Sequence, residues 1–162
     1  MKQQAALALG AIVLAACAST GSTLSPEERL QLYRGNSDPV GTFRIDNSAG
    51  RVVHWSAIND QALTVMGFSA QPYLLETRNR CSGLNSATSV ALSNSFGTVA
   101  PGFDSVQPLS AGRQATSPSC RIATARRINQ GGVKQAKRDL KEAREASLVD
   151  RDPQARPDDG KD

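Results

Sequence analysis

Apolar and polar residues alternate along the central part of the chain, beginning just after Gly41. Phe43 and Ile45 are flanked by polar residues, as in a strand that buries only one of its faces. Similar short apolar runs, separated by turn-forming residues, predict strands at 43–45, 52–55, 62–68, 72–75, 89–92, 98–100, 103–106 and 120–123, with a polar loop at 107–119. The pattern predicts a mainly β domain over residues 25–128, built as a small antiparallel sheet, barrel or sandwich.

A short helix is predicted at the start of this domain. Ser25 is typical of an N-cap residue, Pro26 suits the first helical position, and Glu28 lies three residues after the cap. We expect the helix to end at Arg34, because Gly35 can adopt the left-handed conformation that follows many helices.

The chain changes character after Ile128. Two consecutive glycines at 131–132 are expected to break the chain, and a charged helix is predicted from Val133 to Leu148, within an extension that spans 129–149. Its apolar positions form a thin stripe at heptad spacing: Val133, Ala136, Leu140 and Ala143. Residues 150–162 are expected to be disordered, because eight of the thirteen are charged.

The N-terminus carries the features of an export signal. Lys2 precedes an uncharged, mostly apolar run at 5–16, which spans about 18 Å as a helix and is too short to cross a hydrocarbon core of roughly 30 Å. The run ends in Leu-Ala-Ala before Cys17, which resembles the lipobox of bacterial lipoproteins. The resemblance implies that residues 1–16 are a signal peptide, that the Cys17 thiol is lipidated, and that residues 17–24 form a tether. The alternative is an ordinary signal peptide with an incidental cysteine.

Two cysteines remain in the exported part of the chain. Export places Cys81 and Cys120 in an oxidising compartment, where a disulfide is the expected state. The alternative is a redox-active or metal-binding pair. The two residues lack CxxC spacing, and the single histidine of the chain, His54, cannot complete a zinc site with them. The sequence therefore favours a structural disulfide.

The net charge of +4 comes mainly from the C-terminal end. Residues 17–120 contain seven basic and seven acidic side chains, whereas residues 121–162 contain eleven basic and eight acidic ones. The sequence pI of 9.3 therefore reflects the excess positive charge of the C-terminal tail, not a basic domain. No stretch interleaves aromatic and basic residues as a nucleic-acid surface does, so we expect no nucleic-acid partner.

No group of residues predicts catalysis. His54 lies between Val53 and Trp55 in a predicted strand, without a GxSxG motif, and is expected to face solvent. Asp60 and Asp104 occupy positions that favour local hydrogen bonds of aspartate. We expect no catalytic residues, metal site or cofactor.

Two aromatic residues are candidates for binding a ligand. Trp55 and Tyr73 could line a groove on one face of the sheet. In a chain with 4% aromatic residues, they are more often anchors of the hydrophobic core.

The order of several short motifs resembles a family of uncharacterised proteobacterial lipoproteins. These motifs are Phe43-Arg44-Ile45, Trp55 with Ile58-Asn59-Asp60, Tyr73-Leu74-Leu75, Cys81 with Leu84, Phe103-Asp104 with Val106, and Cys120-Arg121-Ile122. The resemblance covers roughly 40–128, which would make the tail after Ile128 a lineage-specific addition. It implies an envelope location and a Cys81–Cys120 bond, and it carries no known activity.

These observations lead to one functional expectation and one alternative. We expect a lipid-anchored protein on the outer membrane that faces the periplasm and acts as a non-enzymatic structural or interaction protein. Ala18 after the lipidated cysteine favours the outer membrane by resemblance to enterobacterial sorting rules. The C-terminal extension is the expected contact with an envelope protein or an anionic surface. The alternative is a periplasmic module that binds a small molecule or a glycan near Trp55 and Tyr73.

Overall fold

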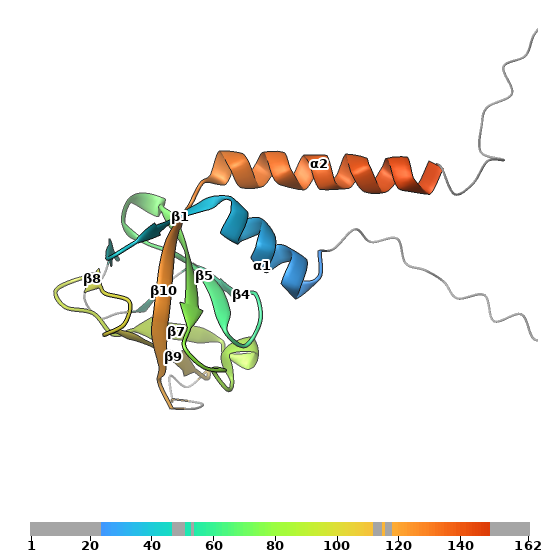
Figure 1. Cartoon of the computed structure of the whole chain (residues 1–162). Coiled ribbons are helices and arrows are strands. Elements are labelled where there is room, and N and C mark those ends of the chain that lie inside the picture. The colour runs from blue at the N-terminus through green and yellow to red at the C-terminus, as the bar shows by residue number, and fades with distance from the viewer. Residues whose placement is uncertain (1–23, 47–50, 53, 112–114, 116–117, 150–162) are drawn as a thin grey trace, which may run out of the picture.

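A computed structural model describes residues 24–46, 51–52, 54–111, 115 and 118–149 (Figure 1). The elements in chain order are α1 (Pro26–Gly35), β1 (Ser37–Val40), β2 (Phe43–Arg44), β3 (Arg51–Val52), β4 (Trp55–Ala57), β5 (Ala62–Met66), β6 (Pro72–Thr77), β7 (Ser89–Leu92), β8 (Thr98–Val99), β9 (Ser105–Leu109), β10 (Cys120–Ile128) and α2 (Gln130–Val149), with single 3-10 turns at Phe68–Ala70 and Leu84–Ser86.

The main sheet is antiparallel and nearly closed. Its strands are paired in the order β3-β7-β9-β10-β6-β5-β4, and β1 adds to the free edge of β10. The two outermost strands, β3 and β4, are consecutive in the chain, so the sheet curls back toward itself like a barrel. Strands β2 and β8 form a separate two-stranded sheet. The expectation of a mainly β fold with a helix at each end is therefore confirmed.

The core lies inside the curled sheet. Strand residues that alternate inward are completely or almost completely buried there, among them Leu63, Val65, Leu75, Val90, Val106 and Ile122. A second, smaller cluster lies on the outer surface, where Leu30 and Leu32 of α1 and Val133 of α2 cover Leu74 and Ile128. The neighbours Leu74 and Leu75 point to opposite faces of β6 and are both fully buried. The helices therefore complete the packing of the domain.

Several strand predictions need correction: the strand predicted at 62–68 ends at Met66, and the one predicted at 103–106 begins at Ser105. Strand β1 was not expected, because Pro39 and its polar neighbours do not show the alternation of a strand. Proline is tolerated there because β1 lies at an edge of the sheet. Strand β9 continues to Leu109, into the predicted polar loop, and β10 continues to Ile128. The predicted strand at 52–55 is divided between β3 and β4.

The glycine pair at 131–132 begins α2 instead of interrupting the chain. The side chain of Asn129 accepts a hydrogen bond from the Gly132 N–H at 3.1 Å, as an N-cap does. A Cβ atom on Gly132 would lie 2.6 Å from Oδ1 of Asn36. A glycine here lets the start of α2 approach Asn36 at the end of α1, so the pair serves packing.

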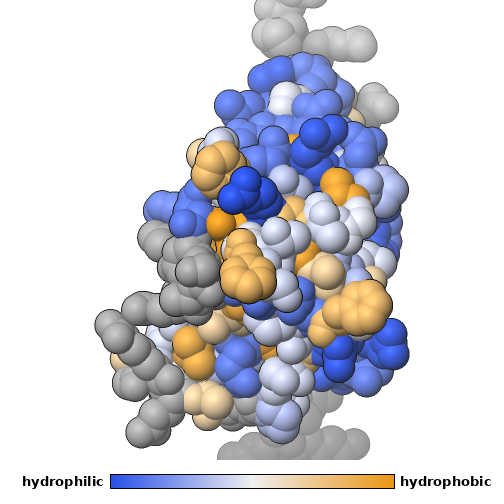
Figure 2. Space-filling view, turned by 90° about the vertical axis from the view of Figure 1, so that its left-hand side faces the viewer, coloured by the Kyte–Doolittle hydropathy of each residue, from blue (hydrophilic) through white to orange (hydrophobic). Residues whose placement is uncertain are grey.

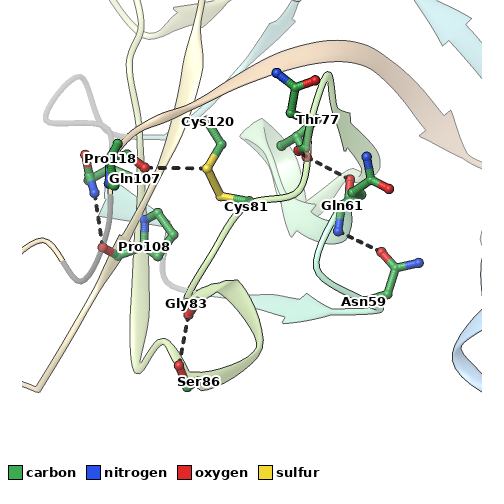
Figure 3. The surroundings of a disulfide bond; sticks show 11 residues. Asn59, Gln61, Thr77, Cys81, Gly83, Ser86, Gln107, Pro108, Pro118 and Cys120 are labelled. Atoms are coloured by element: carbon green, nitrogen blue, oxygen red, sulfur yellow. Dashed lines mark hydrogen bonds between the residues drawn. A yellow bond between two sulfur atoms is a disulfide. The ribbon is translucent and has the colours of Figure 1, made fainter.

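The predicted disulfide is present between Cys81 and Cys120 (Figure 3). It joins the segment after β6 to the first residue of β10, with 5.6 Å between the Cα atoms. Cys81 is fully buried, and its N–H donates to the carbonyl of Asp60 at 2.7 Å. An attack on the Cys120 sulfur would release a thiolate at Cys81 inside the core, where burial disfavours charge. The environment favours a structural bond over a redox-active one.

We predict that replacing both cysteines by alanine (Cys81→Ala, Cys120→Ala) lowers the free energy of unfolding by about 4 kcal/mol. The bond joins residues separated by 39 positions. A cross-link over this separation lowers the conformational entropy of the unfolded chain, which stabilises the folded state by about 4 kcal/mol. Urea unfolding measures the difference, and reduction of the native protein should give the same loss. A change below about 1 kcal/mol would contradict this role.

A second prediction concerns Gly67. A Cβ atom at Gly67 would lie 2.7 Å from both the Arg44 carbonyl oxygen and the Tyr73 ring, whereas one at Gly41 meets nothing within 4 Å. Gly67→Ala should therefore lower the free energy of unfolding by about 1–3 kcal/mol through overpacking. Gly41→Ala, the matched control, should change it by no more than about 0.5 kcal/mol. Equal effects of the two variants in urea unfolding would refute this explanation.

Candidate functional site

An open groove lies between α1 and α2. It has a volume of about 690 Å³ and is lined by Glu27, Glu28, Gln31, Leu32, Ala136, Asp139, Leu140 and Ala143. We call this set of residues the α1–α2 groove. Its floor is apolar, and its margins carry three carboxylates. Figure 1 shows that the end of α1 lies beside the start of α2, that the two helices diverge from there, and that α2 extends beyond the domain.

The domain fixes the position of α1. Ser25 and Glu28 form a capping box at its first turn. The Arg29 guanidinium donates to the carbonyls of Ala57 and Ile58, at 3.1 Å each, and ties the helix to the end of β4. At the other end, Arg34 pairs with Glu76 of β6. One wall of the groove is therefore held rigidly.

Only the beginning of α2 packs on the domain. Val133 is buried and Ala136 is half-buried in the outer cluster. Leu140 is 39% exposed, and Ala143 is also exposed. The predicted apolar stripe therefore exists on one face, but the domain covers only its first half. The second half forms the far wall of the groove.

The charges at the groove are only partly paired. Arg144 binds Glu28 across the groove at 2.7 Å. Glu27 and Asp139 accept hydrogen bonds from glutamine amides, at 2.9 and 2.7 Å, and form no ion pair within the described part of the chain. The carboxylates of Glu27 and Asp139 can therefore form ion pairs with basic groups of a molecule bound in the groove.

The pKa of the Glu28 carboxyl lies below its ordinary value. The largest cause is its hydrogen bonding with Ser25, whose backbone N–H donates to the carboxylate at 2.8 Å, and Arg144 adds to the effect. The ionised form therefore stabilises the first turn of α1. This stabilisation is present above the ordinary pKa and is lost as the pH falls through the lowered one.

A polar pocket of about 400 Å³ lies beside the disulfide. It is lined by Asn79, Arg80, Ser82, Ser105, Pro118, Ser119, Cys120 and Arg121. Arg80 pairs with Asp60 at 2.6 Å, and Arg121 donates to the carbonyl of Phe103. Sequence reasoning did not find this pocket, because three separate segments meet there only after the disulfide has joined two of them.

Trp55 and Tyr73 share the inner face of the sheet. Each is the cross-strand neighbour of the buried Val65, and both are half-buried against the core. The Tyr73 ring stacks on Phe43 with 4.5 Å between centroids. Neither residue lines the groove or the polar pocket. Their role in ligand binding stays a prediction, whereas the packing agrees with a role as core anchors.

The other candidate residues are not brought together into a reactive group. His54 is exposed, Asp60 pairs with Arg80, and Asp104 accepts hydrogen bonds from Ser93 and from the N–H of Ala100. Among the described residues, no three side chains of His, Cys, Asp or Glu gather as a metal site would require. The predicted signal peptide (1–16), Cys17, the predicted tether up to residue 23 and residues 150–162 lie outside the described residues.

Sequence reasoning missed three exposed phenylalanines. Phe68 is 51% exposed, Phe103 82% and Phe96 100%, so that of the four phenylalanines only Phe43 is buried. Phe68 and Phe103 fell within predicted strands, where apolar residues are expected to be buried. In the structure all three lie in or next to turns.

The fold and these surfaces define a small, mainly β domain with a nearly closed sheet and a two-helix groove. The chain belongs to DUF6491, a family of unknown function whose model matches residues 1–146. The match extends beyond 40–128 on both sides, so α2 up to residue 146 belongs to the family pattern and is not a lineage-specific addition. No curated protein and no solved structure matches the chain. In the described part of the chain, no helix has the length and apolar character needed to span a membrane.

We predict that the Glu28 carboxyl titrates below its ordinary pKa of about 4.5 in the native chain. In Arg144→Gln the midpoint should rise but remain below that value, because the Ser25 N–H still donates to the carboxylate. Side-chain carboxyl NMR during a pH titration measures both midpoints. A native midpoint at or above 4.5 would contradict the hydrogen bonds with Ser25, and no change in the variant would show that the ion pair across the groove does not form.

Proposed function

We propose that this chain is a lipid-anchored protein of the bacterial envelope, held on the outer membrane and facing the periplasm. Its role is to make contacts with other macromolecules and not to catalyse a reaction. The anchor is supported by the export pattern at 1–16 and by the position of Cys17 directly after Leu-Ala-Ala. Several acyl chains on one residue provide stable membrane attachment.

The observation that carries the contact role is the exposed second half of the α2 stripe. A helix with so little apolar surface gains stability mainly from packing against another surface. The domain covers Val133 and Ala136 but leaves Leu140 and Ala143 facing the open α1–α2 groove. These two residues offer an apolar surface to a partner, and the buried Leu32 lines the groove opposite them.

A second candidate function is a module that binds a small molecule or a glycan. The polar pocket beside the disulfide favours it, because two arginines and several hydroxyl groups line one concave site. These groups suit a ligand with hydroxyl or acidic substituents. This candidate uses the pocket in place of Trp55 and Tyr73.

Crosslinking and co-purification from intact cells tests the first proposal. Leu140→Gln places an amide in the groove, whereas Ala146→Gln makes the same kind of change at an exposed position outside it. We expect the native chain and Ala146→Gln to capture the same partner, and Leu140→Gln to capture at least about five times less. A chain that ends at Lys137 keeps Val133 and Ala136 for the domain and should capture none.

Equal capture by all four chains would move the contact to the β domain and contradict a role for α2. Capture by none of them would contradict the proposal as a whole and favour the polar pocket as the functional site.

A further inference from the structure

The three exposed phenylalanines lie at one end of the domain. Phe96 is in the turn that leads into β8, Phe103 is in the turn that follows β8, and the ring of Phe68 packs on Arg44 of β2, the partner strand of β8. We call this set (Phe68, Phe96 and Phe103) the phenylalanine face. Figure 2 views this side of the molecule and shows hydrophobic side chains exposed among polar ones.

The backbone holds these rings in solvent. Phe96 has a φ of 51°, in the left-handed region that bulky residues rarely adopt. It forms a two-residue hairpin turn with Gly97, a position where asparagine is usual. The turn is fixed by two hydrogen bonds: the Gly97 N–H donates to Asn94 at 2.8 Å, and the Gly97 carbonyl accepts from the N–H of Ile45 at 2.9 Å. Such ordering lowers the entropy that binding must remove.

The turn that carries Phe103 is fixed in a similar way. Both carboxylate oxygens of Asp104 are occupied: one accepts from the Ser93 hydroxyl and the other from the Ala100 N–H, at 2.7 Å each. The guanidinium of Arg121 donates to the Phe103 carbonyl. The backbone at Phe96 and Phe103 is therefore ordered by hydrogen bonds within the chain.

The face and the α1–α2 groove lie at opposite ends of the molecule. In Figure 1, β8 and the turns beside it are on the left, whereas the start of α1 and the diverging helices are on the right. The tether at 17–24 spans at most about 28 Å, and a domain of about 100 residues is about 33 Å wide. A chain anchored through Cys17 therefore directs the face away from its bilayer or along its surface, which argues against the bilayer as the occupant.

We propose that the phenylalanine face of one copy of this chain docks in the α1–α2 groove of a second copy, so that copies associate head to tail. The proposal deepens the contact role above and rests on it. The groove has a volume of about 690 Å³, which is large enough for aromatic rings. Its floor is apolar and lies between the carboxylates of Glu27 and Asp139.

The phenylalanine face carries guanidinium groups, and the groove carries carboxylates that could pair with them. The guanidinium of Arg44 lies 5.3 Å from the centre of the Phe68 ring, and Arg121 contacts the backbone of Phe103. Glu27 and Asp139, at the groove, form no ion pair within the described residues. Asp46 lies near Arg44 in sequence and is exposed, so the face is of mixed charge and the contact depends on the local arrangement of rings and guanidinium groups.

An interface of this kind joins two different surfaces and can extend into rows. Each copy offers one face and one groove, and a row parallel to the membrane keeps every tether near the bilayer. Confinement on a surface raises the effective concentration, so even a weak contact suffices.

The test measures energy transfer between donor- and acceptor-labelled copies of the full lipidated chain on phosphatidylcholine vesicles. One variant damages the face (Phe96→Ser with Phe103→Ser), and another damages the groove (Leu140→Glu). We expect either variant alone to lose association, with affinity at least about tenfold weaker. A 1:1 mixture of the two variants should recover transfer and stop at pairs, because each pair retains one intact face and one intact groove.

Two matched controls separate packing from folding defects. Phe96→Leu with Phe103→Leu keeps apolar side chains on the face and should retain most of the association. Ala146→Glu adds a charge to α2 outside the groove and should behave as the native chain does.

Transfer at the random level for the native chain at every surface density would overturn the inference. So would a mixture of the two variants that fails to recover transfer. If the serine variants instead release an unlipidated Cys17→Ser chain from vesicles containing phosphatidylglycerol, the face binds lipid and the inference is wrong. Loss of partner capture by Leu140→Gln, together with a monomeric native chain, would leave the contact role intact and assign the groove to a different protein.

Discussion

Strand β10 and the disulfide at its first residue are the constraint on which the rest of the molecule depends. The strand pairs with β9 at its start, with β6 along its length and with β1 at its end, and Cys120 joins it covalently to Cys81 in the core. Its last residue, Ile128, is buried beneath the helices, and α2 begins two residues later. The same strand therefore joins the two halves of the sheet, β3-β7-β9 and β6-β5-β4, and positions the groove.

The sequence predicted those elements whose signals are local. The cap at Ser25 and the alternation around Phe43 depend on a few neighbouring residues, and the Cys81–Cys120 bond was expected because export was expected. It did not predict β1 or the full length of β10. Pro39 and the arginines at 126–127 are unfavourable in a strand pattern, and the strands that pair with these segments cannot be identified from the sequence. The exposed Phe96 was missed for a similar reason: only the hairpin geometry turns it away from the core.

The two candidate surfaces differ in how they arise. The α1–α2 groove exists because the apolar stripe of α2 extends past the part of the helix that packs on the domain. The phenylalanine face follows from turns that are fixed by their own hydrogen bonds and present rings to solvent. They lie at opposite ends of a small domain whose described part begins at the groove end, so the proposed anchor would place one contact surface near the membrane attachment and the other far from it. Both are consistent with a protein that works by contact.

The proposed lipid attachment at Cys17 would determine how both surfaces are oriented in the cell, and the intact mass of the membrane-extracted chain tests it most directly. Lipid anchoring predicts the mass of residues 17–162 plus a diacylglyceryl group and an acyl chain. The mass of residues 17–162 alone, or of the full chain without cleavage, would contradict it.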